Sequence, residues 1–171
     1  MGGPIETTVT FLEMPQPRIT TVPCPAGNFA ILRALKPQVH FYRYLYDQVG
    51  AGYMWVDRRR LSDAQLAEIL GDDLVELYVL YVGGCPAGYG ELDFRAGGEA
   101  TLAYFGMLAD YAGRGFGKFF LAELIATAWS HEISRLKVQT CTLDHPAALR
   151  LYQRLGFVPY AQSTEAVQTL D

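Results

Sequence analysis

The chain has 171 residues, of which 50% are hydrophobic and 19% charged, and its formal net charge is −4. This length and composition favour one compact domain, which we expect to span residues 1–171. The acidic balance argues against nucleic acid or an anionic membrane surface as a partner. Because no apolar run could span a bilayer and the first residues lack a cleavable leader pattern, we expect a cytoplasmic protein.

The cysteines are odd in number and far apart: Cys24, Cys85 and Cys141. They show neither a CxxC spacing nor a pattern of Cys and His ligands. Such usage fits reduced thiols rather than a disulfide framework or a structural zinc site, and we expect no metal.

The N-terminal third predicts an arm, a strand and two helices. Residues 1–26 contain a β-prone segment (7–13) followed by four prolines, which predicts an N-terminal extended arm. A strand is expected over 28–35, and a helix over 39–49 that ends at Gly50. Ser62 and Gln65 form a capping box for a second helix that ends at Gly71.

The helix expected over 39–49 is dense in aromatic residues. Helical spacing places them on two neighbouring faces, with Phe41, Tyr44, Leu45 and Gln48 on one and Tyr42 and Tyr46 on the other. This pattern fits either a core-facing helix or a pocket wall whose phenol groups orient a substrate. The basic run 58–60 is interpreted as a solvated face, with contact to a nucleotide phosphate or an acidic substrate as the alternative.

Glycine turns separate three strands in the middle of the chain, over 75–82, 86–95 and 99–107, which predicts an antiparallel meander. On the second strand Tyr89, Glu91 and Asp93 share one face. Its two carboxylates fit either a general base with a partner or a solvent-facing edge. On the third strand alternate residues from Glu99 to Met107 share a face, and Gly106 indicates a bulge or a close backbone approach.

A glycine-rich loop, Gly113-Arg114-Gly115-Phe116-Gly117-Lys118, leads into an apolar helix over 115–131. Glycines let backbone N–H groups converge on an anion, and a helix N-terminus adds its dipole and unpaired N–H groups. Arg114 and Lys118 add positive charge. The alternative is an ordinary glycine turn.

A strand over 136–143, a helix that begins after Asp144-His145-Pro146 and ends at Gly156, and a last strand complete the chain. The whole pattern predicts an α+β fold. We expect a mixed, mostly antiparallel twisted sheet of about seven strands with flanking helices, built as a meander followed by β-α-β-α-β.

Two segments, 105–118 and 144–157, together resemble the GNAT superfamily of acyl-CoA-dependent N-acetyltransferases. The family's loop pattern is Gln/Arg-x-x-Gly-x-Gly/Ala, and its second signature is Asn-x-x-Ala-x-x-Leu-Tyr-x-x-x-Gly-Phe. The resemblance covers residues 28–160 in matching element order. Two positions depart from it: Ala112 replaces the loop's Gln/Arg, and His145 replaces the Asn.

The resemblance implies a GNAT-like fold and acetyl-CoA as co-substrate. The backbone of Phe105, Gly106 and Met107 would pair with the pantetheine arm. The loop Gly113, Arg114, Gly115, Phe116, Gly117 and Lys118 would hold the pyrophosphate. His145 would hydrogen-bond the pantetheine region, with a plain helix cap as the alternative.

For catalysis, the resemblance implies that Tyr152 is the general acid to the CoA sulfur; a half-buried Tyr that seals the helix to the sheet is the alternative. Thr101 occupies the family's base position, so we choose Glu91 as base. Glu99 acting through water, or an amine that arrives neutral, stays open. The implied reaction is transfer of acetyl from acetyl-CoA to a primary amine by direct attack in a ternary complex.

A non-catalytic acyl-CoA-binding sensor or structural module is the alternative. A Rossmann or P-loop nucleotide site fits neither the glycine spacing nor the meander. By the resemblance, region 39–61 shapes the acceptor pocket, and its aromatic residues Tyr42, Tyr46, Tyr53 and Trp55 predict an aromatic wall. Glu91 and Asp93 would favour a cationic amine. Acceptors from small amines to a peptide N-terminus stay open, as does a homodimer.

Overall fold

The computed structural model describes residues 3–170, and within them seven strands form one sheet in the order β2-β3-β4-β5-β6-β1-β7. The strands are β1 (Ile5–Met14), β2 (Phe29–Ala34), β3 (Val75–Val82), β4 (Cys85–Asp93), β5 (Glu99–Met107), β6 (Arg135–Cys141) and β7 (Val158–Val167). The helices are α1 (Val39–Gly50), α2 (Asp63–Gly71), α3 (Phe116–Trp129) and α4 (Ala148–Arg154), and the 3-10 turns are η1 (Ala51–Tyr53), η2 (Arg58–Arg60) and η3 (Ala109–Tyr111).

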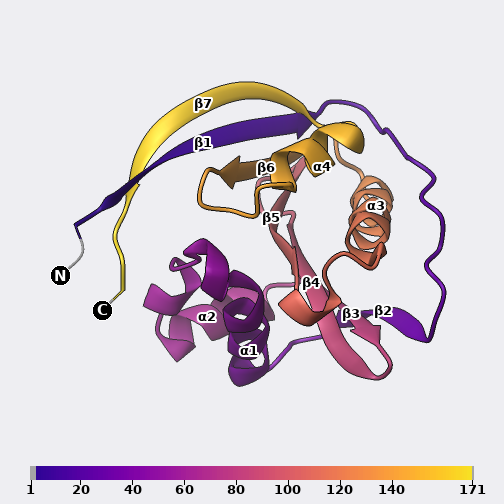
Figure 1. Cartoon of the computed structure of the whole chain (residues 1–171), viewed down its shortest axis with the longest axis horizontal. Coiled ribbons are helices and arrows are strands. Elements are labelled where there is room, and N and C mark those ends of the chain that lie inside the picture. Colours follow the sequence, from indigo (N-terminus) through magenta and orange to yellow (C-terminus); the bar gives the residue numbers. More distant parts are fainter. Residues whose placement is uncertain (1–2, 171) are drawn as a thin grey trace.

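Helices cover both faces of this sheet: α1 and α2 lie on one side, and α3 and α4 lie on the other (Figure 1). Each side has its own apolar core. Phe120 and Leu124 of α3 belong to the core that also holds Tyr152, and Leu45 of α1 belongs to the second core with Leu66 of α2. Successive side chains of a strand point to opposite faces of the sheet, so the same strands contribute side chains to both cores.

The expected α+β fold is confirmed. Strands β2 to β5 form an antiparallel meander, and β5 and β6 form a parallel pair that requires the crossover helix α3. The capping box before α2 is also present: the Ser62 hydroxyl accepts from the Gln65 N–H at 3.2 Å, and the Gln65 side chain accepts from the Ser62 N–H at 2.9 Å.

The N-terminal segment 1–26 contains a strand of the sheet. Residues 5–14 form β1, which pairs antiparallel with β6 on one side and β7 on the other (Figure 1). The proline-rich stretch after it, residues 17–25, lacks regular structure and runs as an extended connection to β2. Because β6 and β7 supply backbone partners from the distant end of the chain, the sequence near β1 gave no sign of this placement.

The buried face of α1 takes residues from both aromatic faces of the predicted helix. Tyr42, Leu45, Tyr46 and Val49 are buried, whereas Tyr44 is 45% exposed. The helix therefore faces the core, with Tyr42 and Tyr46 turned inward. The orientation is set by aromatic contacts with the sheet: Tyr42 packs edge-on against Tyr89 at 5.8 Å between ring centroids.

Strand β5 carries a bulge beside the sheet's centre. Glu91 of β4 faces Tyr104, but the next residue of β4 faces Leu102, so Ala103 is the extra residue. The bulge breaks the single face expected for 99–107, since Leu102 and Phe105 both belong to the core on the α3 side. Gly106 instead allows α1 to pack closely on the backbone of β5, since a Cβ at residue 106 would lie 2.3 Å from Val49 Cγ1 of α1.

Candidate active site

The central feature of the site is a split between the parallel strands β5 and β6. They pair only where Glu99–Leu102 face Arg135–Val138, and beyond that point each strand continues without the other. On its far side β5 stays paired with β4 as far as Met107. The backbone groups of residues 103–107 that point toward β6 therefore have no strand partner and are available to a ligand.

A cavity of about 710 Å³ occupies this split. Both strands line it, together with the loop after α1, the loop before α3, the start of α4, and the outer parts of β1 and β7. An extended ligand could lie in it against the free edge of β5, as an added strand would.

The cavity collects most of the residues expected at a cofactor site. It is lined by Phe105, Gly106, Met107, Gly113, Gly117, His145 and Tyr152. Four expected residues lie outside the lining. Arg114, Gly115 and Lys118 are exposed beside it, and Phe116 is buried in the core, where its ring meets Phe29 at 5.5 Å. At Phe116 only the backbone is therefore free to contact a ligand.

The glycine loop has the backbone that the pattern predicts. Gly113 and Gly115 have φ values of +77° and +82°, a conformation that strongly favours glycine. Gly115 caps α3, and no side chain satisfies the free N–H groups of the first helical turn. Gly117 lies in that turn and faces the cavity. The loop thus presents unpaired N–H groups and the positive end of a helix dipole next to the split.

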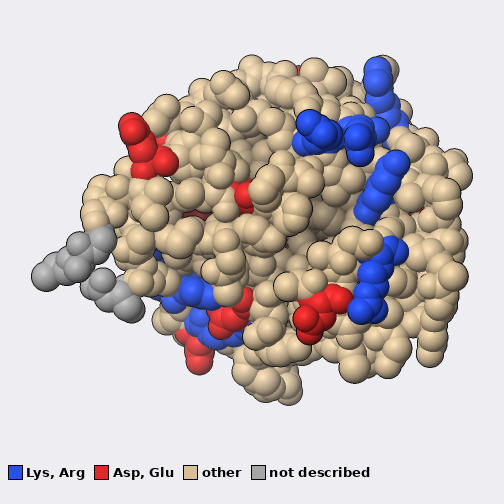
Figure 2. All heavy atoms as spheres, in the orientation of Figure 1, with Lys and Arg blue, Asp and Glu red and all other residues tan. Residues whose placement is uncertain are grey.

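Positive side chains also gather near this end of the molecule. In the view of Figure 2, Lys and Arg side chains lie mainly on the side of α3 and α4. Arg114 and Lys118 stand at the start of α3, and Arg150 and Arg154 are exposed on α4. An anionic ligand at the loop would therefore meet favourable charge on both helices.

Tyr152 brings a phenol into the cavity from α4. Its side chain is 6% exposed and packs edge-on against Phe157 at 5.8 Å. Burial, and then the negative charge of Asp144, raise the pKa of the Tyr152 phenol. The phenol therefore keeps its proton and suits the role of an acid rather than a base.

His145 lies at the exposed rim of the cavity. Its Nδ1 accepts a hydrogen bond from the Ala147 N–H at 3.0 Å in the turn before α4, whose N-cap residue is Ala147 and not His145. Its ring also packs edge-on against Tyr53, with centroids 5.7 Å apart. The loop that follows α1 and the segment before α4 thus meet at this rim.

Glu91, the residue chosen as general base, is buried away from the cavity in the split. Its side chain is 0% exposed and does not line the cavity. Both carboxylate oxygens are occupied, one by the Arg58 guanidinium at 2.6 Å and the other by the Tyr42 hydroxyl at 2.5 Å. This arrangement is a buried ion pair and corrects the solvent-facing interpretation of the strand.

In the basic run 58–60, Arg59 and Arg60 are exposed, as the solvated-face interpretation predicts, whereas Arg58 is largely buried, and each arginine also has a protein partner. Arg58 bonds Glu91, Arg59 bonds Asp47 at 2.7 Å, and Arg60 donates to the Gln168 carbonyl at 2.5 Å. Burial alone would lower the pKa of Arg58, but Glu91 and two phenols outweigh it and raise the pKa.

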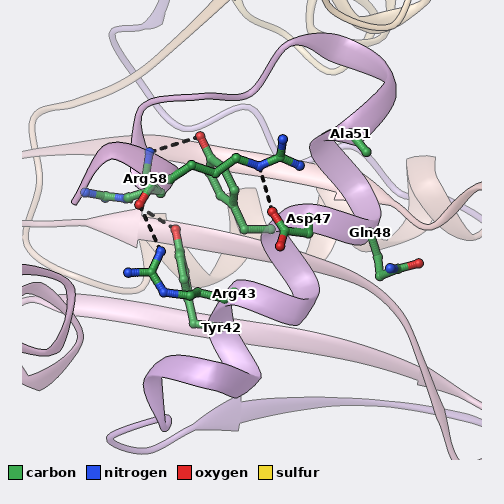
Figure 3. Close-up of a pocket in the computed structure, with 8 residues that line it drawn as sticks. Tyr42, Arg43, Asp47, Gln48, Ala51 and Arg58 are labelled. Carbon is green, nitrogen blue, oxygen red and sulfur yellow. Dashed lines mark hydrogen bonds and ion pairs between the residues drawn. The ribbon is translucent and has the colours of Figure 1, made fainter. Parts of the chain in front are cut away.

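Figure 3 shows Arg58 beside α1, where its backbone N–H donates to the Tyr46 hydroxyl at 3.2 Å. The surrounding residues line a second cavity, of about 520 Å³. Tyr42 and Tyr46 line this second cavity and not the one in the split. Of the four aromatic residues expected at the acceptor wall, only Tyr53 and Trp55 therefore reach the split, where the ring of Trp55 lies 5.2 Å from that of Tyr104.

Several residues that line the cavity were not predicted from the sequence. Asp57, Asp144 and Glu165 bring carboxylates to the cavity, and Thr7 and Val9 of β1 form part of its wall. Asp144 stood next to a recognised helix start, but nothing local marked it as a cavity residue. Thr7, Val9 and Glu165 reach the site through the pairing of β1 with β7, which no short motif encodes, and Asp57 lies in the loop between η1 and η2.

Comparison with protein families gives a match to the acetyltransferase (GNAT) family over residues 37–157. The chain belongs to this family, and the resemblance seen in its two motifs is confirmed. A comparison with curated proteins gives no significant match.

Solved structures share the fold at low sequence identity. A putative acetyltransferase of the GNAT family from Novosphingobium aromaticivorans has a TM-score of 0.66 and 16% identity, over 95% of this chain and 64% of that one. A functionally unknown conserved protein from Staphylococcus epidermidis has a TM-score of 0.67 and 15% identity, over 95% and 61%. The chain thus spans less than two thirds of the length of these two proteins.

A third structure, an aminoglycoside acetyltransferase from an uncultured soil metagenomic sample in complex with sisomicin, matches over nearly its whole length. Its TM-score is 0.64 at 14% identity, over 84% of this chain and 97% of that chain. At these identities the likeness shows the fold alone.

Two further findings concern residues 3–170. No helix in this part of the chain is long and apolar enough to pass through a membrane. The same residues contain no cluster of three or more His, Cys, Asp or Glu side chains arranged to bind a metal ion.

Proposed function

We propose that this protein transfers the acetyl group of acetyl-CoA to a primary amine by direct attack in a ternary complex. The observation that carries the proposal is the split between β5 and β6, which opens a ligand-sized cavity beside unpaired backbone and the Tyr152 phenol. Family membership supplies the reaction class, and the geometry of this chain supplies the groups.

The residues present fit acetyl-CoA at three points. The free edge of Phe105, Gly106 and Met107 would pair with the amide-containing pantetheine arm, as one strand pairs with another. The N–H groups of the loop 113–117 and of the first turn of α3 would hold the pyrophosphate. Exposed Arg114 and Lys118 would add charge near the phosphates. Ala112 removes the usual side chain of the loop but leaves its backbone donors in place.

The chemistry needs an acid and a route for the amine proton. The amine nitrogen forms a bond to the thioester carbonyl carbon, the C–S bond breaks, and the leaving sulfur takes a proton from Tyr152. The attacking nitrogen loses one proton, and water restores the proton of the phenol. Because Glu91 is enclosed with Arg58, we assign the uptake of the amine proton to water at the open rim of the cavity rather than to Glu91.

The acceptor would enter between Trp55, Tyr53 and the ends of β1 and β7. None of the described residues that line the cavity is Lys or Arg, whereas Asp57 and Glu165 are among them. This lining suits an amine better than an acid. The sisomicin complex of the metagenomic neighbour is consistent with an amine acceptor in this fold.

A non-catalytic acyl-CoA-binding module is the second candidate. The burial and full pairing of Glu91 favour it, because the structure offers no carboxylate at the expected base position. Tyr152, held protonated at the cavity, favours turnover.

Two measurements separate these functions. Acetyl-CoA should raise the melting temperature, because a ligand that binds only the native state stabilises it; no shift at millimolar ligand would refute both. Release of CoA thiol is then followed with a panel of monoamines, diamines, aminoglycosides and peptides. Amine-dependent release supports the transferase, and binding without release across the panel supports the module.

A further inference from the structure

One hydrogen bond joins the two walls of the split. The indole Nε1–H of Trp55 donates to Asp144 Oδ1 at 3.2 Å, between residues 89 positions apart in the chain. Both residues line the cavity. This bond lies beyond the point where β5 and β6 stop pairing.

Trp55 belongs to the β5 wall. Its ring lies 5.2 Å from Tyr104 of β5 and 5.5 Å from Tyr46 of α1, measured between centroids. It packs so closely over Gly50 that a Cβ on Gly50 would lie 2.5 Å from Trp55 Cβ. The indole therefore has little freedom to move away from β5.

Asp144 belongs to the β6 wall. Its Oδ2 accepts from the Thr140 hydroxyl at 2.8 Å and from the Cys141 N–H at 2.9 Å, which fixes the carboxylate to the end of β6. Its Oδ1 is left to accept from the other wall. An ionised carboxylate accepts only, so all three donors are satisfied by one residue.

We propose that Asp144 is a positioning residue that holds the split at the width acetyl-CoA requires by clamping Trp55 to the end of β6. The bond replaces the ladder hydrogen bonds that β5 and β6 lack in this region. A preformed cavity spares a ligand the cost of ordering its walls, so the clamp contributes to affinity without lying in the pyrophosphate loop. The inference rests on the proposed binding of acetyl-CoA.

The substitution Asp144→Asn tests the clamp at constant size. The amide has one acceptor oxygen where the carboxylate has two, so it can serve the donors of β6 or Trp55 but not both. We expect it to stay with the two donors of β6 and release Trp55. Asp57→Asn is the matched control, since it removes the same charge from the same cavity and breaks no hydrogen bond of the described residues.

The first readout needs no ligand. In a Trp129→Phe background the Trp55 indole N–H gives the one indole signal in a ¹H–¹⁵N spectrum. Hydrogen bonds to charged groups contribute about 1.5–3 kcal/mol, so Asp144→Asn should shift this signal and speed its exchange with solvent by roughly tenfold or more. Asp57→Asn should do neither. An unchanged signal in Asp144→Asn would overturn the clamp.

The second readout is a double-mutant cycle on acetyl-CoA affinity, measured by calorimetry. Trp55→Phe and Asp144→Asn should each weaken binding by about tenfold, and the double variant should lose no more than either single one. Losses that add would overturn the proposal, as would full affinity in either variant. If the native protein itself binds no acetyl-CoA, the proposed function and the role of the clamp in binding both fail; if it binds and the cycle is additive, only the clamp fails.

Discussion

Arg58→Met tests the role that the structure gives to Glu91. The substitution removes the guanidinium 2.6 Å from a carboxylate that is 0% exposed and keeps most of the side-chain volume. Tyr42 would remain as the sole partner of that carboxylate. Breaking a buried ion pair from one side costs about 3–5 kcal/mol, because a buried charge loses its compensation. Contact of the guanidinium with the Tyr104 ring, 5.2 Å from its centroid, adds to the loss by about 0.5–1 kcal/mol.

The two losses together come to about 3.5–6 kcal/mol. In a protein of this size each kcal/mol shifts the melting temperature by about 2–4 °C, so Arg58→Met should lower it by roughly 7–24 °C. Calorimetry and urea unfolding at neutral pH would measure the change. Arg59→Met is the matched control, because its pair with Asp47 is 36% and 49% exposed and such pairs contribute at most about 1 kcal/mol.

Equal losses in Arg58→Met and Arg59→Met would refute the burial argument. A triple variant adds a further check. Replacing Arg58, Glu91 and Tyr42 together by Met, Leu and Phe removes every member of the polar group. It should recover most of the stability lost in Arg58→Met, because apolar residues of similar volume need no compensation. Failure to recover would mean that packing, and not the lone charge, caused the loss.

Four further predictions concern the site and the residues that support it. Tyr152→Phe should slow thiol release by about a hundredfold while acetyl-CoA affinity stays within about threefold, and normal turnover would exclude Tyr152 as the acid. With the native phenol, the raised pKa means that the acid form persists as pH rises, so release should not decline between pH 7 and 9 through loss of this proton. Gly106→Ala should lower stability by about 1–3 kcal/mol, since its Cβ would lie 2.3 Å from Val49 Cγ1, and Val49→Ala should relieve most of that loss; an additive double variant would contradict the clash. Ser62→Ala should cost about 1 kcal/mol by urea unfolding, and no change would show that the capping box is not formed in solution.

The sequence was most informative where a feature depends on neighbours along the chain. The turns of the meander, the capping box at Ser62 and the positive φ of Gly113 and Gly115 are local, and residue type alone indicates them. The two family motifs then placed the cavity between β5 and the start of α4. Tyr152 was found in this way, because its helix is itself one of the motifs.

The misjudged residues depend on partners far away in sequence. Alternation placed Glu91 on a known face of β4, but its burial depends on Arg58, 33 residues earlier. The sequence did not decide which face of α1 is buried, since two aromatic faces of similar character compete and contact with Tyr89 decides between them. No residue type indicates the bulge at Ala103. The nearby glycine, Gly106, instead allows the close contact with Val49 of α1.

The position of β1 inside the sheet has a consequence for how the protein is made. Its partners are residues 135–141 and 158–167, so β1 leaves the ribosome well before either partner strand. At about 5–20 residues per second, the 121 residues from Pro15 to Arg135 take roughly 6–24 s to add. During this time β1 is an unpaired strand with apolar residues such as Leu12 and Met14 uncovered. Because Thr7 of β1 and Val167 of β7 both line the cavity, the nascent protein has no complete binding site until residue 167 has been added. Deletion of β7 would therefore abolish ligand binding and leave one edge of β1 open to aggregation.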